Sequence, residues 1–241
     1  MLRRLTLTTA ALAALLAGGS AHAQVPPLAA SVSACETGPD PADRFAEFSA
    51  SMPREGAAIM GMRFVLYEKL PGGRFVRVSL PNWEEWERTG KAKVPGFVFT
   101  KRVEELATPA SFKAIVTFRW YDDEGGVLRT TRRTTEVCKQ PDWRPDLVID
   151  RAVFTSDGRA RVTVANRGRT AAAPFRVTMG VADSLSSALA TPLAAGERRT
   201  LTMARCRGPE QAVFTVDAAG AVDEADEGDN VLVVACPTDR P

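Results

Sequence analysis

Short stretches of alternating apolar and polar residues, separated by turn residues, recur along most of this chain. In the clearest one, Phe112–Tyr121, the residues Phe, Ala, Val, Phe and Trp alternate with Lys, Ile, Thr, Arg and Tyr. A period of two places each set on one face of a strand, and the acidic, glycine-ended segment 122–126 that follows predicts a hairpin loop. Long windows show no helical period, and only Asn82–Thr89 is compatible with a helical turn. The pattern predicts an all-β fold built of sandwiches or barrels.

The strand pattern occurs on both sides of a proline-rich segment, residues 139–145. Two prolines in seven residues stiffen a connector, and every lysine lies at or before Lys139. We therefore predict two tandem immunoglobulin-like β-sandwiches, residues 24–139 and 146–241, joined by a linker at 140–145. Residues 182–195 are interpreted as a link between strands. The predicted strands are 62–67, 75–78, 97–100, 112–121, 127–137, 147–154, 162–164, 175–181, 198–203, 213–216 and 231–234.

Residues 1–23 have the features of a secretory signal peptide. Two arginines precede an apolar run, Leu5–Leu16, and Ala21-His22-Ala23 places small residues where signal peptidase cleaves. Cleavage after Ala23 would leave Gln24 as the first residue and remove His22, the only histidine. The mature chain would then lack the commonest general base and metal ligand. The sequence predicts a protein that is secreted, or associated with the cell envelope.

The charge of the predicted mature chain is balanced. The full sequence has 31 Lys+Arg and 29 Asp+Glu, and residues 1–23 contain two of the arginines and no acid. A balanced surface argues against nucleic acid or an anionic membrane as a general partner. Outside the predicted signal peptide, no stretch approaches the roughly 20 apolar residues that a membrane span needs.

Four cysteines behind an export signal predict two disulfides. Of the three pairings that four cysteines allow, we prefer Cys35–Cys138 and Cys206–Cys236, because the proline-rich linker then separates the pairs. A thiolate metal site is the alternative, but the sequence has no close pair such as C-x-x-C, and the predicted mature chain has no histidine to complete a set.

Two tryptophans, Trp83 and Trp86, lie among the acids of the segment 82–87. Aromatic rings beside carboxylates can bind sugars, because the rings stack on apolar sugar faces while the acids accept hydrogen bonds from hydroxyls. A tryptophan that closes the core of a sandwich is the alternative interpretation. We therefore treat Trp83 and Trp86 as candidate ligand-binding residues.

An acidic segment near the C-terminus offers hard oxygen ligands for a weak Ca²⁺ site, the only cofactor that the sequence suggests. The spacing of its acids does not follow the EF-hand pattern, and a solvated loop between the last two strands is the alternative. The candidate ligands are Asp223, Glu224, Asp226, Glu227, Asp229 and Asn230.

Catalysis by carboxylates needs no histidine, so a glycan hydrolase is a further hypothesis. The acidic doublets Glu84-Glu85 and Glu104-Glu105 are its candidates. Adjacent residues of a strand point to opposite faces, so neither doublet makes a ready pair. Arg129, Arg132 and Arg133 add positive charge to one predicted strand, where they would protect a sheet edge.

Several short segments of the second half share the residues of one bacterial family. They are Pro145-Asp146-Leu147, Val162–Gly168, Leu193–Glu197, and the acidic stretch from Val216-Asp217 through Val222-Asp223-Glu224 to Asp229-Asn230. Through them, residues 145–237 resemble CARDB, the cell-adhesion-related domain found in bacteria. The resemblance implies an immunoglobulin-like sandwich of an adhesive or binding type, without enzymatic activity. Usual members have paired asparagines where Asp229-Asn230 stands, and the Cys206–Cys236 pair is not a general family feature.

In the first half, Leu106, Pro109 and Phe112 are spaced three residues apart and lead into an alternating strand. This resembles the corner before a fibronectin type III strand, where a tyrosine usually stands six residues after the leucine. Phe112 keeps the ring but lacks the hydroxyl. The resemblance implies a fibronectin III-like or immunoglobulin-like sandwich over about residues 29–139 and carries no function.

Together these features predict a non-catalytic binding or adhesion protein that recognises an extracellular protein or glycan. Recognition would use loops on a rigid scaffold. A structural or accessory protein for a protein partner is the alternative, and a carboxylate-based glycan hydrolase is a third.

Overall fold

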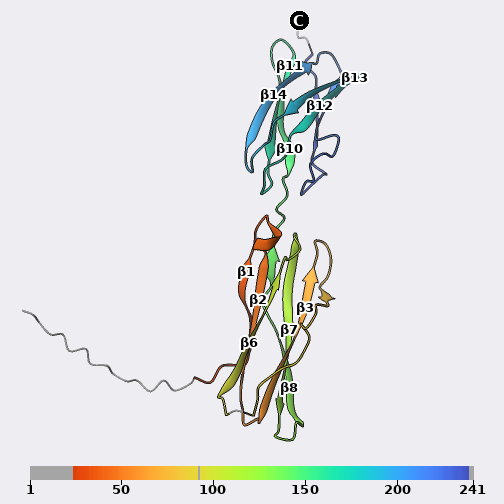
Figure 1. Cartoon of the computed structure of the whole chain (residues 1–241). Helices are drawn as coiled ribbons and strands as arrows, with labels where there is room; N and C mark the ends of the chain where they lie inside the picture. The colour runs from red at the N-terminus through yellow and green to blue at the C-terminus, as the bar shows by residue number, and fades with distance from the viewer. Residues whose placement is uncertain (1–23, 92, 239–241) are drawn as a thin grey trace, which may run out of the picture.

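A computed structural model describes residues 24–238 except residue 92, so the predicted signal peptide and His22 lie outside the described residues. The described chain is built of strands β1–β16 and one short 3-10 helix, Pro41–Asp43 (Figure 1). All of its strand pairs are antiparallel. The predicted all-β fold is confirmed. Within the same residues, no helix is long and apolar enough to cross a membrane.

The first sandwich packs a three-stranded sheet against a larger one. Its core contains Phe48, Met52, Phe64 and Phe118, all fully buried. The smaller sheet has the order β1 (Ala29–Glu36), β2 (Phe45–Pro53) and β6 (Gly96–Glu104). The larger has the order β4 (Val76–Val78), β3 (Ile59–Lys69), β7 (Ala110–Tyr121) and β8 (Val127–Thr134), with β5 (Glu87–Arg88) paired to β3 and β9 (Cys138–Gln140) paired to β7.

Strand β7 shows why this sequence forms a sheet. Its residues Phe112, Ala114, Val116, Phe118 and Trp120 are at most 3% exposed and face the core. The residues between them lie on the outer face, as the period of two predicts. The loop Asp122–Gly126 then returns the chain into β8, which confirms the predicted hairpin.

The second sandwich has its own core, which includes Leu147, Val164, Val177, Leu193 and Phe214. One of its sheets has the order β10 (Leu147–Phe154), β11 (Arg159–Asn166) and β14 (Arg198–Arg205). The other has the order β13 (Ser184–Ala190), β12 (Phe175–Val181), β15 (Gln211–Val216) and β16 (Val231–Ala235). Figure 1 shows the two sandwiches placed end to end, with a thin connector between them.

Three sequence interpretations need correction. Residues 182–195 are not only a link, because they contain β13, paired along its length with β12. Asn82–Thr89 forms no helix: the chain turns at residues 81–84, with Asn82 at φ 58°, and β5 then pairs with Gly61 and Met62 of β3. Gln140 belongs to β9 and not to the linker, so residues 141–146 connect the sandwiches.

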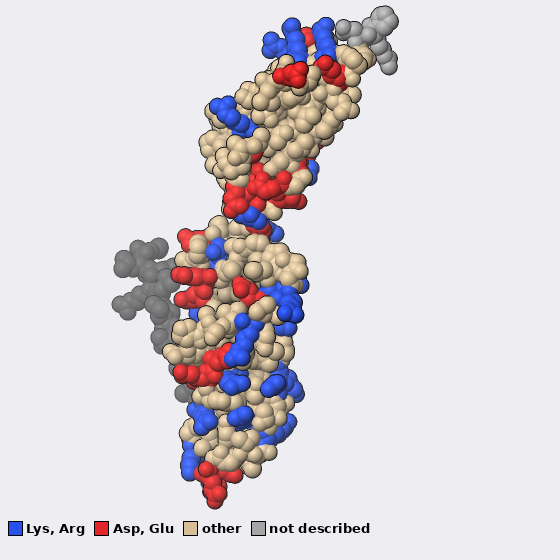
Figure 2. Space-filling model, turned by 90° about the vertical axis from the view of Figure 1, so that its right-hand side faces the viewer, with Lys and Arg blue, Asp and Glu red and all other residues tan. Residues whose placement is uncertain are grey.

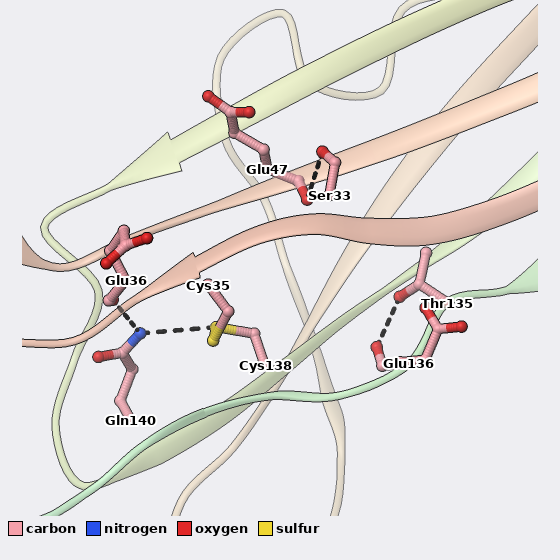
Figure 3. Close-up of a disulfide and its surroundings, with 8 residues drawn as sticks. All are labelled: Ser33, Cys35, Glu36, Glu47, Thr135, Glu136, Cys138 and Gln140. Atoms are coloured by element: carbon pink, nitrogen blue, oxygen red, sulfur yellow. Dashed lines mark hydrogen bonds between the residues drawn. A yellow bond between two sulfur atoms is a disulfide. The ribbon is translucent and has the colours of Figure 1, made fainter.

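Both predicted disulfides are present. Cys35 of β1 bonds Cys138 of β9, with 5.5 Å between the Cα atoms (Figure 3). Cys206, after β14, bonds Cys236, after β16, with 5.4 Å between the Cα atoms. In each sandwich the bond therefore joins one sheet to the other. Beside the first, Gln140 Nε2 donates to the Glu36 carbonyl oxygen at 2.9 Å.

Candidate functional site

The acidic segment 223–230 is largely occupied with structural bonds. Glu224 is 1% exposed, and its Oε2 accepts a hydrogen bond from the backbone N–H of Leu147, the first residue of β10. Its Oε1 accepts from Asn230 Nδ2 at 3.2 Å, and the same amide nitrogen donates to Glu227 Oε2 at 3.3 Å. The segment is thereby bonded to a strand that begins about 80 residues earlier in the sequence.

The same segment also holds the connector. The backbone N–H of Ala225 donates to the Pro145 carbonyl oxygen at 2.8 Å. Arg144 Nη1 donates to Asp223 Oδ1 at 2.8 Å, while Arg144 Nη2 donates to Asp142 Oδ2 at 2.9 Å. We call this set of contacts the junction clasp, comprising Asp142, Arg144, Pro145, Asp223, Glu224 and Ala225. Figure 2 shows acidic side chains gathered at this end of the second sandwich, next to the connector.

The connector is bonded at its other end as well. Thr108 Oγ1 of the first sandwich donates to the Pro141 carbonyl oxygen. On the side of the second sandwich, Thr170 Oγ1 donates to the Trp143 carbonyl oxygen at 2.7 Å. Backbone groups of a short loop that are bonded on both sides have little freedom to rotate. Together with the clasp, these two bonds restrict the directions in which one sandwich can point relative to the other.

Burial and hydrogen bonding shift the pKa values of the carboxyl groups in and beside the clasp in opposite directions. It raises the pKa of Glu224 to about 7, against the hydrogen bonds from Leu147 and Asn230, which favour the charged form. Burial, followed by repulsion from Asp229 and Asp226, also raises the pKa of Asp146. The pKa of Asp142 is lowered, because its carboxylate accepts hydrogen bonds from the Arg144 side chain.

Glu224 should make the second sandwich more stable in mild acid. Its carboxyl binds a proton more tightly in the folded chain, with a pKa of about 7, than in the unfolded chain, with a pKa of 4.5. Its contribution to the free energy of unfolding is therefore fully present below pH 4.5 and is lost as the pH rises through 7. After allowance for screening by solvent, we expect a change on the order of 1–2 kcal/mol.

Urea titrations between pH 4.5 and 8 measure this change. Glu224→Gln should remove the part of the pH dependence that lies in this window, whereas Glu210→Gln, at an exposed position, should leave it intact. Identical pH profiles for the wild type and the Glu224 variant would show that the carboxyl titrates at its ordinary value.

Among the described residues, no three His, Cys, Asp or Glu side chains are grouped so that they could hold a metal ion. Glu224, Glu227 and Asn230, three of the six predicted calcium ligands, are bonded to one another. We expect that millimolar Ca²⁺ shifts the melting temperature by no more than about 1 °C, as measured by calorimetry. A rise of several degrees would instead indicate a site, for which Asp146 and Asp229 have Oδ1 atoms that are buried without a hydrogen-bond partner.

The two candidate tryptophans have different positions. Trp83 is 5% exposed, and its ring packs edge-on against Phe48 with 6.2 Å between the ring centroids. It closes the core of the first sandwich, so its ring faces are not open to a ligand, and the stacking interpretation is withdrawn for this residue. Trp86 is only partly buried and lies over the outer face of the sheet that contains β3 and β7.

Around Trp86, the structure gathers positive and aromatic side chains. The guanidinium carbon of Arg119 lies 4.4 Å from the centroid of the Trp86 ring, and that of Arg63 lies 5.5 Å away. Arg88 stacks on Tyr121 at 5.0 Å. Arg63, Trp86, Arg88, Arg119 and Tyr121 form what we call the cation–aromatic cluster. Attraction between cations and ring faces fixes its geometry.

A glycine makes room for this cluster. A Cβ atom at Gly61 would lie 3.1 Å from Tyr121 Cε2 and 3.3 Å from Trp86 Cε3, closer than most side-chain contacts. Because Gly61 has no side chain, both rings can lie directly on the strand. The sequence indicates Trp86 but not the two arginines on its ring, since Arg63 comes from β3 and Arg119 from β7, both distant from Trp86 in the sequence.

The acids considered for a hydrolase either form ion pairs with arginines or lie in turns. Glu84 pairs with Arg77, and Glu104 Oε1 lies 2.8 Å from Arg102 Nε. Glu105 occupies a turn with φ 52°. Of the three arginines of β8, Arg129 pairs with Glu55, while Arg132 and Arg133 are exposed.

Comparisons with solved structures give only weak similarities. The red sea bream transglutaminase shares 10% identity with a TM-score of 0.31, covering 90% of this chain but 32% of its own length. A chaperone–tip adhesin complex of CFA/I fimbriae shares 7% with a TM-score of 0.28, covering 86% of this chain and 98% of its own length. The chicken CNTN1 FN1–FN3 domains share 11% with a TM-score of 0.27, covering 86% and 63%.

Among curated proteins, no sequence matches this chain significantly. A family model does match: residues 144–234, which contain the whole of β10–β15 and most of β16, match the model of the CARDB family. The resemblance inferred for the second sandwich is thereby confirmed.

Proposed function

We propose that this protein is a non-catalytic binding protein of the cell surface or envelope, which holds an extracellular ligand on its first sandwich. The CARDB match and the all-β fold support an adhesion-related β-sandwich protein. Two disulfides support an oxidising location outside the cytosol. The observation that carries the proposal is the cation–aromatic cluster, an aromatic surface with adjacent positive charge on a rigid sheet.

This proposal places recognition on a sheet face, whereas the sequence suggested loops. Side chains on a sheet are held by the strands beneath them, so a ligand does not have to order them when it binds. Trp86 itself lies in a connecting segment, but Gly61 and the two arginines fix its ring on the sheet. The site therefore combines a loop residue with a rigid platform.

The test uses the exported, disulfide-bonded chain and envelope material from the cells that produce it. We expect saturable binding that Trp86→Ala weakens at least about tenfold, while Leu185→Ala, a control at an exposed apolar position of the second sandwich, has no effect. Incubation with the bound material should release no reducing sugar. Release of sugar that a single Glu→Gln substitution abolishes would show a hydrolase instead.

The junction clasp favours a second candidate function, an accessory protein that sets the distance or orientation between partners. A restricted connector serves such a role because it limits the relative positions of the two sandwiches. In that case a specific protein partner should copurify with the chain, and Trp86→Ala should leave the copurification unchanged.

A further inference from the structure

We propose that the outer face of the sheet β4-β3-β7-β8 binds an acidic polysaccharide, with the cation–aromatic cluster at its centre. The inference rests on the proposed function and names the ligand class. It is drawn from the arrangement of charge across the strands, from the lack of acidic partners for that charge, and from the exposed part of Trp86.

Strand register places the charges on one face. Arg63 of β3 is opposite Thr117 of β7, which is opposite Arg132 of β8. In a row further along the sheet, Lys69 of β3 is opposite Ser111, which is opposite Lys139 of β9. Directly opposed residues of neighbouring strands point to the same side of a sheet. Because Met62, Phe64 and Phe118 face the core, these odd-numbered positions of β3 and β7 face outward.

With Lys113 and Arg119 of β7, the outward cations form what we call the basic face: Arg63, Lys69, Lys113, Arg119, Arg132 and Lys139. Lys69 lies six positions after Arg63, and Arg119 lies six positions after Lys113. At about 3.4 Å per residue, the charges of each strand are spread over about 20 Å. Figure 2 shows basic side chains gathered along the first sandwich.

The charge of this face is not neutralised within the protein. None of its six cations forms an ion pair with a described residue. Glu84, which lies beside the face, is already paired with Arg77. Arginines of the second sandwich differ in this respect, since Arg159, Arg198 and Arg199 pair with Asp157, Asp150 and Glu197. An uncompensated row of cations attracts an anionic partner.

The aromatic component favours a sugar over other anions. Trp86 is partly exposed beside two guanidinium groups, so the apolar face of a sugar ring can stack on the indole while a neighbouring carboxylate or sulfate accepts hydrogen bonds from arginine. A spread of charge over about 20 Å suits an extended polymer with repeated charge better than one small anion.

The experiment measures the affinity of the full exported chain for four probes: polygalacturonate, a sulfated polysaccharide, neutral dextran and double-stranded DNA. Calorimetric titrations at low and high salt give the dissociation constants. We expect binding to at least one acidic polysaccharide that is weaker at high salt, weaker binding of DNA, and none of dextran. Arg63→Gln/Arg119→Gln and Trp86→Ala should each weaken binding at least about tenfold.

Two further variants separate recognition from folding. Lys69→Gln/Lys139→Gln removes two exposed charges of the same face and should weaken binding severalfold without a change in melting temperature. Arg159→Gln/Arg198→Gln removes the same charge from the second sandwich and should leave affinity unchanged. Two results would overturn the inference: equal affinity for DNA and for the acidic polysaccharides, or an equal loss of affinity in the Lys69/Lys139 and the Arg159/Arg198 variants. Either result would show that binding depends on net charge alone.

The outcomes also separate this inference from the proposed function. If envelope material binds in a way that depends on Trp86 while both acidic polysaccharides fail to bind, the ligand class is wrong and the binding function stands. If neither envelope material nor any probe binds, both are wrong.

Discussion

Replacing Cys35 and Cys138 together with alanine should lower the free energy of unfolding of the first sandwich by about 2–5 kcal/mol. The bond joins β1 to β9, hence one sheet to the other, across 103 residues of sequence. In the chain-entropy model, a closed loop of that length restricts the unfolded chain by about 4.7 kcal/mol, against about 3.5 kcal/mol for the 30 residues between Cys206 and Cys236.

Guanidinium titration followed by tryptophan fluorescence measures the first loss, because Trp83, Trp86 and Trp120 all lie in the first sandwich. Cys206→Ala/Cys236→Ala is the matched control and should leave the fluorescence transition of the first sandwich nearly in place. If the Cys35/Cys138 variant costs less than about 1 kcal/mol, the unfolded chain is already restricted in some other way, and the entropic account is wrong.

Asn166→Ala should destabilise the second sandwich by about 3 kcal/mol or more. The side chain is 1% exposed and uses both ends of its amide. Its Oδ1 accepts from the backbone N–H groups of Asp146 and Gly168 at 3.1 and 3.0 Å. Its Nδ2 donates to the carbonyl oxygens of Thr170 and Leu193 at 2.8 and 3.0 Å. Alanine leaves all four backbone groups without this partner, in places that water reaches poorly.

Asn166→Asp separates the accepted from the donated hydrogen bonds, since the carboxylate keeps the former and loses the latter. We expect this variant to be less stable than the wild type as well, because a charge replaces an amide in a buried position. Thr200→Ala is the surface control: it removes the 2.9 Å hydrogen bond between Thr163 and Thr200 and should cost less than about 0.5 kcal/mol. Calorimetry of the three variants decides the matter, and a melting temperature of Asn166→Ala close to that of the control would contradict the prediction.

Two strands could be predicted to the residue, and the strongly alternating β7 was predicted to within two residues of its start. Leu147–Phe154 and Phe175–Val181 have the bounds that the sequence predicts. Strand β13, Ser-Leu-Ser-Ser-Ala-Leu-Ala, could not, because serine and alanine favour strands weakly and its hairpin turns at Ala182, with φ 45°, without glycine or asparagine. Strand β13 forms because β12 provides a partner along its length. Strand β2 was missed for a related reason, since Ala and Ser occupy four of its nine positions.

The candidate site could be predicted only in part, because its contacts are distant in sequence. The acidic segment stood out by composition, but its bonds to Leu147 and Arg144 span 77 and 79 residues. Composition alone therefore suggested a metal site where the structure shows a clasp. In the same way, Trp86 stood out as an aromatic residue among acids, whereas the arginines on its ring come from two other strands. The sequence shows which residues could bind a ligand, but strand pairing decides which of them lie close together.

The position of the Cys35–Cys138 bond matters if the molecule is pulled. Figure 1 shows the described chain entering the first sandwich at its outer end and leaving the second at the opposite pole, so a load applied between the two ends runs lengthwise through both. In the first sandwich, the covalent path follows β1 to Cys35, crosses the sulfur bridge to Cys138 and enters the connector. The 103 residues of sequence between these cysteines, about 350 Å of extended chain, therefore cannot be drawn out while the bridge holds. Five of the six cations of the basic face lie inside this loop, and Lys139 follows directly after it, so a pull between the two ends would leave their arrangement intact.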